Sequence, residues 1–274
     1  MRNFCIAPSG TAGLETSGRL AREATNFIAW SRLEPRVDGA PTLVFLPGFR
    51  SSMDGQKALT LRDRAATLGC GCLRFDYFGH GRSTGEPMDG TIGRWRGDAL
   101  AVIDAVAPAE AKVVLVGSSM GGWLALLAAA ARPARVAGIA TIAAAPDFTV
   151  DLLPARLTPA QRATLDRDGH VSLPTPYGPD PYPVSRALLT EGGNHRVLAP
   201  NSTVLETIAC PVRLIHGICD TDIPWQRSAA LTEKLSHAPA RLRLVHDGDH
   251  RLSRPVDLGL LGATVEDLVR LVSR

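Results

Sequence analysis

The stretch VVLVGSSMGGWLALLAAAA, residues 113–131, decides the fold. Residues 113–116 are leucine and valine, which favours a buried strand, and residues 123–131 are apolar and rich in leucine and alanine, which favours a helix. Between them, Gly117-Ser118-Ser119-Met120-Gly121 fits the pattern G-x-S-x-G, which is typical of a sharp strand-to-helix turn. The stretch reaches the length of a membrane span, but the glycines in its middle break it. We therefore predict no stable membrane insertion.

The composition is that of a globular protein with one large core. Of the 274 residues, 45% are hydrophobic and 21% charged, and the formal net charge is only +3, so we expect no nucleic-acid partner. The five cysteines show no C-x-x-C spacing, which predicts neither a disulfide framework nor a zinc site. Residues 1–18 lack an apolar run of signal-peptide length, so we expect a cytoplasmic protein.

Strand-like and helix-like segments alternate along most of the chain. Strands are predicted at 42–46, 72–75, 113–116, 136–142, 212–215 and 242–245, and helices at 54–68, 93–106, 120–131, 226–236 and 257–272. This alternation predicts a mostly parallel, doubly wound α/β sheet with helices on both faces. Residues 19–33 predict an antiparallel strand or two at one edge. We expect a single domain over residues 1–274.

Residues 147–205 interrupt the alternation with a proline-rich segment that predicts short helices. One helix is expected at 159–168, because Thr158 and Pro159 form an N-cap and first-turn pair and Gly169 is a stop signal. An insertion between core strands usually surrounds the site, so we interpret it as a small helical cap. The alternative is an excursion that does not contact substrate.

The G-x-S-x-G turn predicts a nucleophile at Ser119, and the alternative is a glycine-rich turn with an inert serine. A serine hydroxyl needs a base to take its proton. In this fold class the base follows the last strand. His250 is favoured over His246, which directly continues the strand and would pack at its end. We interpret His216 and His80 as structural loop histidines.

The base needs a carboxylate that fixes its tautomer, and the developing anion needs two backbone donors. The loop after residues 212–215 offers Asp220 and Asp222, of which the spacing favours Asp220. The N–H of Met120, immediately after the nucleophile, is the first expected donor. The second is the N–H of Phe49, in the turn after residues 42–46.

Several motifs together resemble the α/β-hydrolase serine esterases, most closely the family of mitochondrial palmitoyl-protein thioesterases and acyl-glucuronide esterases with its bacterial relatives. They are Phe45-Leu46-Pro47-Gly48-Phe49, Arg74-Phe75-Asp76-Tyr77, Gly79-His80-Gly81-Arg82-Ser83, Gly117-Ser118-Ser119-Met120-Gly121-Gly122-Trp123 and Gly248-Asp249-His250-Arg251. The resemblance spans about residue 42 to the C-terminus and implies the α/β-hydrolase fold. It also implies Ser119, Asp220 and His250 as the catalytic triad, with no metal or organic cofactor.

Substrate contacts are expected from the cap and the catalytic loops. Trp123, Tyr177 and Tyr182 are candidates for an acyl pocket, together with cap leucines and valines that would otherwise be core. Arg50, Arg251 and Arg254 flank the loops and would attract a carboxylate on the leaving group, unless they are solvated surface charges. The cap candidates besides the tyrosines are Leu152, Leu153, Leu157, Leu165, Val184, Leu188 and Leu189.

These expectations describe a serine hydrolase that cleaves esters or thioesters of small molecules, with acylated proteins as a further substrate class. A carbon–carbon bond hydrolase or an acyltransferase would use the same three residues. A non-catalytic ligand-binding module on the same fold is the alternative from another class.

Overall fold

The computed structural model describes residues 13–23, 25–176 and 181–273. Within them one mixed sheet has the strand order β1-β2-β4-β3-β5-β6-β9-β10. Only β1 and β2 run antiparallel to their neighbours, at one edge, and the other pairings are parallel. The strands are β1 (Glu15–Ala21), β2 (Phe27–Leu33), β3 (Thr42–Leu46), β4 (Gly71–Phe75), β5 (Val113–Ser118), β6 (Val136–Ile142), β9 (Val212–Gly217) and β10 (Ala240–Val245).

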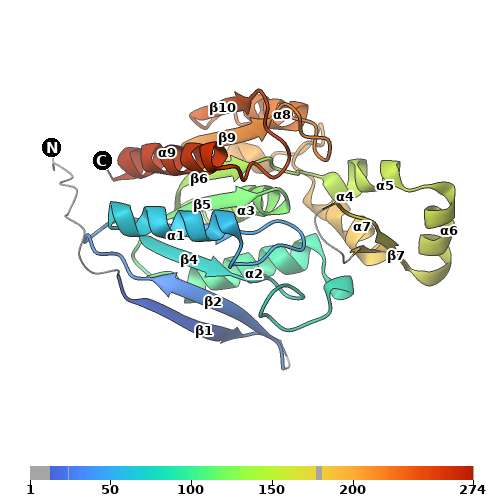
Figure 1. The fold of residues 1–274 in the computed structure, drawn as a ribbon, viewed down its shortest axis with the longest axis horizontal. Coiled ribbons are helices and arrows are strands. Elements are labelled where there is room, and N and C mark those ends of the chain that lie inside the picture. Colours follow the sequence, from blue (N-terminus) through green and yellow to red (C-terminus); the bar gives the residue numbers. More distant parts are fainter. Residues whose placement is uncertain (1–12, 24, 177–180, 274) are drawn as a thin grey trace.

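Helices cover both faces of this sheet (Figure 1). On one face lie α1 (Gln56–Leu68) and α9 (Pro255–Val272), and on the other α2 (Ile92–Ala105), α3 (Met120–Ala131) and α8 (Gln226–Lys234). Strand β3 contributes side chains to the cores on both faces of the sheet, because side chains alternate across a strand. Leu43 and Phe45 pack with α1 and α9, whereas Val44 and Leu46 pack with α2 and α3. The predicted α/β fold and its antiparallel edge are confirmed.

The segment between β6 and β9 differs in part from the helical cap that the sequence predicts. The expected helix is present as α6, with Thr158 as N-cap and Gly169 left-handed at its end, but an antiparallel strand pair, β7 with β8, follows it. Each strand is four residues long, too short for an alternating pattern to stand out. The elements are α4 (Phe148–Asp151), α5 (Leu153–Arg156), α6 (Pro159–Asp168), β7 (His170–Leu173), β8 (Tyr182–Ser185), α7 (Arg186–Gly192), and the 3₁₀ turns η2 (Gly193–His195) and η3 (Val204–Thr207).

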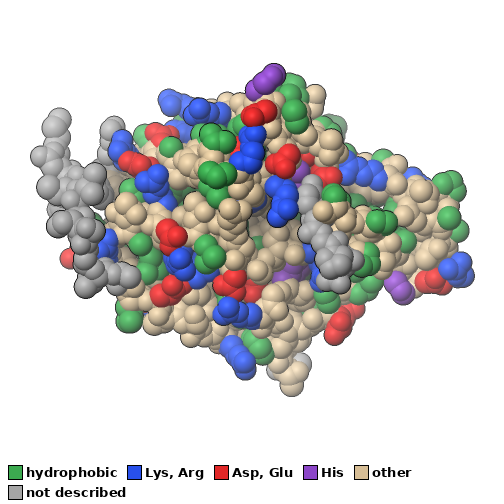
Figure 2. All heavy atoms as spheres, in the orientation of Figure 1, with side chains coloured by type: hydrophobic (Ala, Val, Ile, Leu, Met, Phe, Trp, Pro, Cys, Tyr) green, Lys and Arg blue, Asp and Glu red, His purple; other side chains and the backbone are tan. Residues whose placement is uncertain are grey.

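The surface and the apolar segments also bear on the sequence expectations. No helix in the described ranges is both long and apolar enough to cross a bilayer, and residues 113–131 form β5 and the buried helix α3. Figure 2 shows Lys and Arg side chains interspersed with Asp and Glu on one face. The cysteines at 70, 72, 210 and 219 are free thiols, while Cys5 and most of the N-terminal segment considered for a signal peptide lie outside the described residues.

Candidate active site

Ser119 stands at the turn between β5 and α3, in a backbone conformation that side chains rarely adopt (φ 54°, ψ −118°). The residues two positions before and two positions after it must be glycine for steric reasons. A Cβ atom on Gly117 would lie 2.2 Å from the carbonyl oxygen of Gly121, and one on Gly121 would lie 2.0 Å from that of Leu46. The G-x-S-x-G sequence therefore folds as a tight turn that places the Ser119 hydroxyl at the carboxyl end of the sheet.

The loops after β9 and β10 bring a carboxylate and an imidazole to this hydroxyl. His250 Nε2 lies 3.0 Å from Ser119 Oγ, and His250 Nδ1 lies 2.7 Å from Asp220 Oδ2. Because the carboxylate accepts a hydrogen at Nδ1, Nε2 is left as the acceptor for the serine hydroxyl. Three residues far apart in sequence thus form a continuous hydrogen-bonded chain.

Asp220 is enclosed by donors, and its side chain is fully buried. Its Oδ1 accepts the backbone N–H groups of Asp222 (2.9 Å) and Ile223 (2.8 Å), while its Oδ2 also accepts from His216 Nε2 at 3.0 Å. Burial would raise the pKa of Asp220, but the hydrogen bonds from His216, His250 and the Ile223 amide hold that pKa well below its ordinary value. The carboxylate is therefore ionised at neutral pH.

The contact with His216 is a feature that sequence reasoning missed. His216 Nε2 faces two acceptors, the carboxylate and the Ile223 carbonyl oxygen (2.9 Å), so this nitrogen carries the hydrogen. Its Nδ1 lies 2.7 Å from Ser228 Oγ, which donates to it. The only signal in the sequence is the position of His216 four residues before Asp220 at the end of a strand. His216 is thus a second imidazole on the carboxylate that contacts His250.

The other residues considered for these roles lie elsewhere. Asp222 contributes its backbone N–H to Asp220, and Asp222 also lines the cavity described below. His246 is exposed, so the expectation that it packs at the end of β10 is wrong. Strand β10 is the edge strand of the sheet, and it ends at Val245, directly before His246.

The two expected backbone donors lie in the turns after β5 and β3. Met120 is the first residue of α3, so its N–H has no acceptor within the helix. Within residues 13–23, 25–176 and 181–273, the N–H of Phe49 donates to no backbone carbonyl oxygen. The turn that carries it touches the nucleophile, because a Cβ atom on Gly48 would lie 3.4 Å from Ser119 Cβ. An oxyanion hole needs two such backbone donors without an acceptor beside the nucleophile.

A cavity of about 640 Å³ opens above Ser119 and His250, between the sheet and the insertion. Its size is within the range of small-molecule sites. Apolar side chains from the core and from the insertion line one part of it, including Phe49, Phe148, Leu153 and Tyr182. Four cationic side chains also line it, from Arg50, Lys57, Arg156 and Arg251, with Asp222 as the acidic one.

Some of the expected substrate contacts are contradicted. Trp123 is fully buried and does not line the cavity, because it packs behind Phe148 (ring centroids 6.0 Å apart) and donates its Nε1–H to the His195 carbonyl oxygen. Arg254 instead caps α9 and pairs with Asp247. Tyr177 lies outside the described residues. Arg50, Tyr182 and Arg251 do line the cavity.

Most of the cap leucines are also core rather than lining. Leu157, Leu165 and Val184 form a small core within the insertion together with Val171, and Leu188 packs in the main core. Of the cap candidates within the described ranges, only Leu153 and Tyr182 reach the cavity. In the same ranges, no group of three or more His, Cys, Asp or Glu side chains is placed to hold a metal ion.

Comparison with known proteins agrees with the fold. Residues 43–258 match the sequence model described as the alpha/beta hydrolase family. The chain belongs to the alpha/beta hydrolase family. It is 36% identical over 255 residues to mouse "Palmitoyl-protein thioesterase ABHD10, mitochondrial", covering 93% of this chain and 82% of that protein.

Solved structures give the same family assignment. The "Putative hydrolase from Agrobacterium vitis S4" is 40% identical, with a TM-score of 0.85 over 93% of this chain and 98% of that one. Mouse "Alpha/beta hydrolase domain-containing protein 10" is 34% identical, with a TM-score of 0.81 and the same coverage. The expected resemblance to the palmitoyl-protein thioesterase family and its bacterial relatives is confirmed.

Proposed function

We propose that this alpha/beta hydrolase is a serine hydrolase that cleaves carboxylic esters or thioesters through an acyl-serine intermediate. The observation that carries the proposal is the hydrogen-bonded chain from Ser119 Oγ through His250 to Asp220, with distances of 3.0 and 2.7 Å. Nucleophile, base and orienting carboxylate stand at the separations that proton transfer requires.

The first half of the reaction forms the acyl-enzyme. His250 Nε2 takes the proton of the Ser119 hydroxyl as Oγ attacks the carbonyl carbon, and Asp220 stabilises the resulting imidazolium. The carbonyl oxygen becomes an anion, which the N–H groups of Phe49 and Met120 receive. The tetrahedral intermediate collapses, its bond to the leaving oxygen or sulfur breaks, and His250 returns the proton to the leaving group.

The second half repeats these steps with water. His250 removes a proton from a water molecule, which attacks the acyl carbon, and the same two amides hold the second oxyanion. Collapse breaks the bond to Ser119 Oγ and returns the proton to it from His250. The carboxylic acid leaves, and the enzyme is restored.

The cavity supports an acyl group with an apolar portion and a leaving group that carries negative charge. Phe49, Phe148 and Leu153 provide apolar surface beside Ser119, while Arg50 and Arg251 supply positive charge at the same cavity. The name of the mouse relative adds acylated proteins to small-molecule esters and thioesters as a substrate class.

The test combines covalent labelling with turnover. A fluorophosphonate probe labels wild-type protein, and Ser119→Ala abolishes both labelling and hydrolysis of p-nitrophenyl butyrate and of an acyl-coenzyme A thioester. Ser118→Ala is the matched control, since it removes the neighbouring hydroxyl of the same turn and should remain labelled. Folded wild-type protein that neither reacts with the probe nor hydrolyses any of these substrates would refute the proposal.

A further inference from the structure

The turn that follows β3 has an unusual residue in a glycine position. Ser51 N–H donates to the Gly48 carbonyl oxygen at 3.0 Å, which closes a four-residue turn, and the third residue, Arg50, has φ 59°. A positive φ at the third position is the mark of a type II turn, where glycine or asparagine is usual. A side chain with a Cβ atom disfavours this conformation, so something else must stabilise it.

The stabilising group is the buried imidazole of His80, which is only 4% exposed. Arg50 N–H donates to His80 Nε2 at 3.1 Å, so this nitrogen carries no hydrogen. The hydrogen is therefore on Nδ1, which donates to the Phe78 carbonyl oxygen at 3.1 Å. Burial, followed by the nearby Arg50 charge, lowers the pKa of His80 to about 4, consistent with a neutral ring that accepts the amide.

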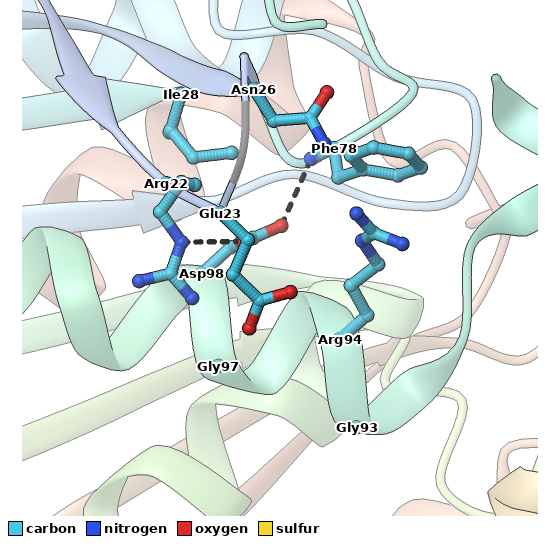
Figure 3. Close-up of a pocket in the computed structure, with 9 residues that line it drawn as sticks. All are labelled: Arg22, Glu23, Asn26, Ile28, Phe78, Gly93, Arg94, Gly97 and Asp98. Atoms are coloured by element: carbon cyan, nitrogen blue, oxygen red, sulfur yellow. Dashed lines mark hydrogen bonds and ion pairs between the residues drawn. The ribbon is translucent and has the colours of Figure 1, made fainter. Parts of the chain in front are cut away.

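A second layer of contacts fixes the backbone beneath His80. The Phe78 carbonyl oxygen also accepts from Trp95 Nε1 at 3.0 Å, and Phe78 N–H donates to the buried Asp98 carboxylate at 3.0 Å. Arg22 pairs with Asp98 at 3.3 Å, and Figure 3 shows Arg22, Phe78 and Asp98 around a small cavity beside α2. Both sides of the Phe78 backbone are therefore held, and the ring of His80 has a rigid base.

We propose that His80 is a positioning residue for the oxyanion hole, because its hydrogen bond to Arg50 N–H holds the turn 48–51 in the form that presents the Phe49 amide. The inference rests on the proposed function. Without this acceptor, the left-handed conformation of Arg50 has no partner that offsets its steric cost, so the turn can relax to another backbone geometry. The Phe49 N–H belongs to the same turn, and Phe49 and Arg50 both line the cavity above Ser119, so such a relaxation would displace the proposed donor.

The ring of Phe49 makes this coupling tighter. It lies 5.6 Å from the ring of Trp95 and 5.3 Å from that of Tyr182, and 6.2 Å from His80 itself. His80 thus contacts both sides of the turn: its acceptor nitrogen binds the amide that follows Phe49, and its ring edge packs near the Phe49 side chain.

Two substitutions test the acceptor nitrogen of His80, Nε2, separately from its donor nitrogen, Nδ1. In His80→Gln the side-chain oxygen can reach the place of Nε2 and accept from Arg50 N–H. In His80→Asn the amide nitrogen takes the place of Nδ1 and donates to Phe78, but nothing reaches Arg50. We expect His80→Asn to lower kcat for a neutral ester by about 10- to 100-fold, less than the roughly 100- to 1000-fold effect of losing one oxyanion donor completely. KM should change less than about threefold, and His80→Gln should stay within about threefold of wild type.

A rescue variant tests the turn directly. Adding Arg50→Gly to His80→Asn should restore most of kcat on the neutral ester, because glycine adopts a positive φ without steric cost. Equal losses in His80→Gln and His80→Asn, a loss confined to KM, or failure of the rescue would overturn the inference.

A measurement on wild-type protein keeps the test independent of how the variants fold. Imidazole ¹⁵N NMR should show His80 with its hydrogen on Nδ1, and a ring protonated on Nε2 would contradict the contact with Arg50 N–H. Wild-type protein without hydrolase activity would refute the proposed function instead, while the tautomer would still report on the turn.

Discussion

Replacing Asp220 by asparagine preserves the shape of the side chain and reverses half of its hydrogen bonding. The carboxylate accepts four hydrogens: two from the backbone at Asp222 and Ile223, and two from the imidazoles of His216 and His250. An amide offers one oxygen and one NH₂ group, so it can satisfy only one of these pairs. With its oxygen toward the two backbone amides, its NH₂ group faces the imidazoles.

This arrangement inverts the tautomer of His250. Its Nδ1 must then accept, so Nε2 carries the hydrogen and points it at Ser119 Oγ, which loses its base. The same substitution in a serine protease lowers kcat about 10⁴-fold, or about 5 kcal/mol in activation free energy at 1.36 kcal/mol per tenfold change. Because the Asp220 side chain is likewise fully buried, we expect a loss of about 10⁴-fold in kcat for Asp220→Asn.

The assay is steady-state hydrolysis of p-nitrophenyl butyrate, with the folded fraction of each variant measured by circular dichroism and the active fraction of wild-type protein by fluorophosphonate titration. Asp222→Asn is the matched control, since Asp222 contacts the network through its backbone N–H, which the substitution retains. A folded Asp220→Asn variant that keeps more than about a tenth of wild-type kcat would refute the reasoning. So would a comparable collapse in Asp222→Asn, which would identify Asp222 as the orienting acid.

Four further predictions concern the turn, the cavity and the buried imidazole. Gly121→Ala should lower Tm and abolish labelling, because the new Cβ would lie 2.0 Å from the Leu46 carbonyl oxygen, and unchanged melting would contradict this. Arg251→Ala should raise KM for anionic esters about 2- to 5-fold and spare neutral ones, and equal effects on both would reject a charge contact. Burial and Arg251 lower the pKa of Lys57 to about 8, so KM for an anionic ester should rise between pH 7 and 9, and Lys57→Met should remove that rise. In the folded protein the pKa of His80 is about 4, below its ordinary value of 6.5 in the unfolded chain. As pH falls, His80 is therefore protonated in the unfolded chain before it is protonated in the folded protein. Stability should therefore drop by up to about 3 kcal/mol between pH 6.5 and 4, and urea titrations should show a shallower drop in His80→Gln.

The core of the fold could be predicted because its strands and helices carry strong, regular patterns. The run from Thr42 to Leu46 is wholly buried and has the bounds that its apolar run suggests, and helix α3 likewise has the predicted ends. The strand pair in the insertion could not be predicted, since β7 and β8 pair across a proline-rich connection and bury few side chains. Their pairing depends on contacts within the insertion, which no local pattern encodes.

The site residues likewise fall into those that the sequence could predict and those that it could not. Ser119, Asp220 and His250 could be selected because each follows a predicted strand, and parallel strands bring their carboxyl ends to one edge of the sheet. Trp123 could not be rejected from the sequence, because a residue four positions beyond the nucleophile lies on α3 and only the packing of Phe148 shows that it is covered. The cavity-facing cation Lys57 was missed, since its helical position alone does not distinguish it from a surface lysine.

Three imidazoles lie near the proposed reaction centre, and their hydrogen bonds determine which one can act as the base. The acceptor nitrogen of His80 already receives a backbone N–H, and that of His216 receives a hydroxyl from α8. Either ring would have to break an existing hydrogen bond before it could take a proton. His250 alone has its acceptor nitrogen directed at Ser119, while its other nitrogen donates to the ionised Asp220. Proton transfer from Ser119 to His250 therefore converts one hydrogen bond into a charge-assisted one and leaves the surrounding network unchanged, which makes this step less costly than transfer to either of the other two rings.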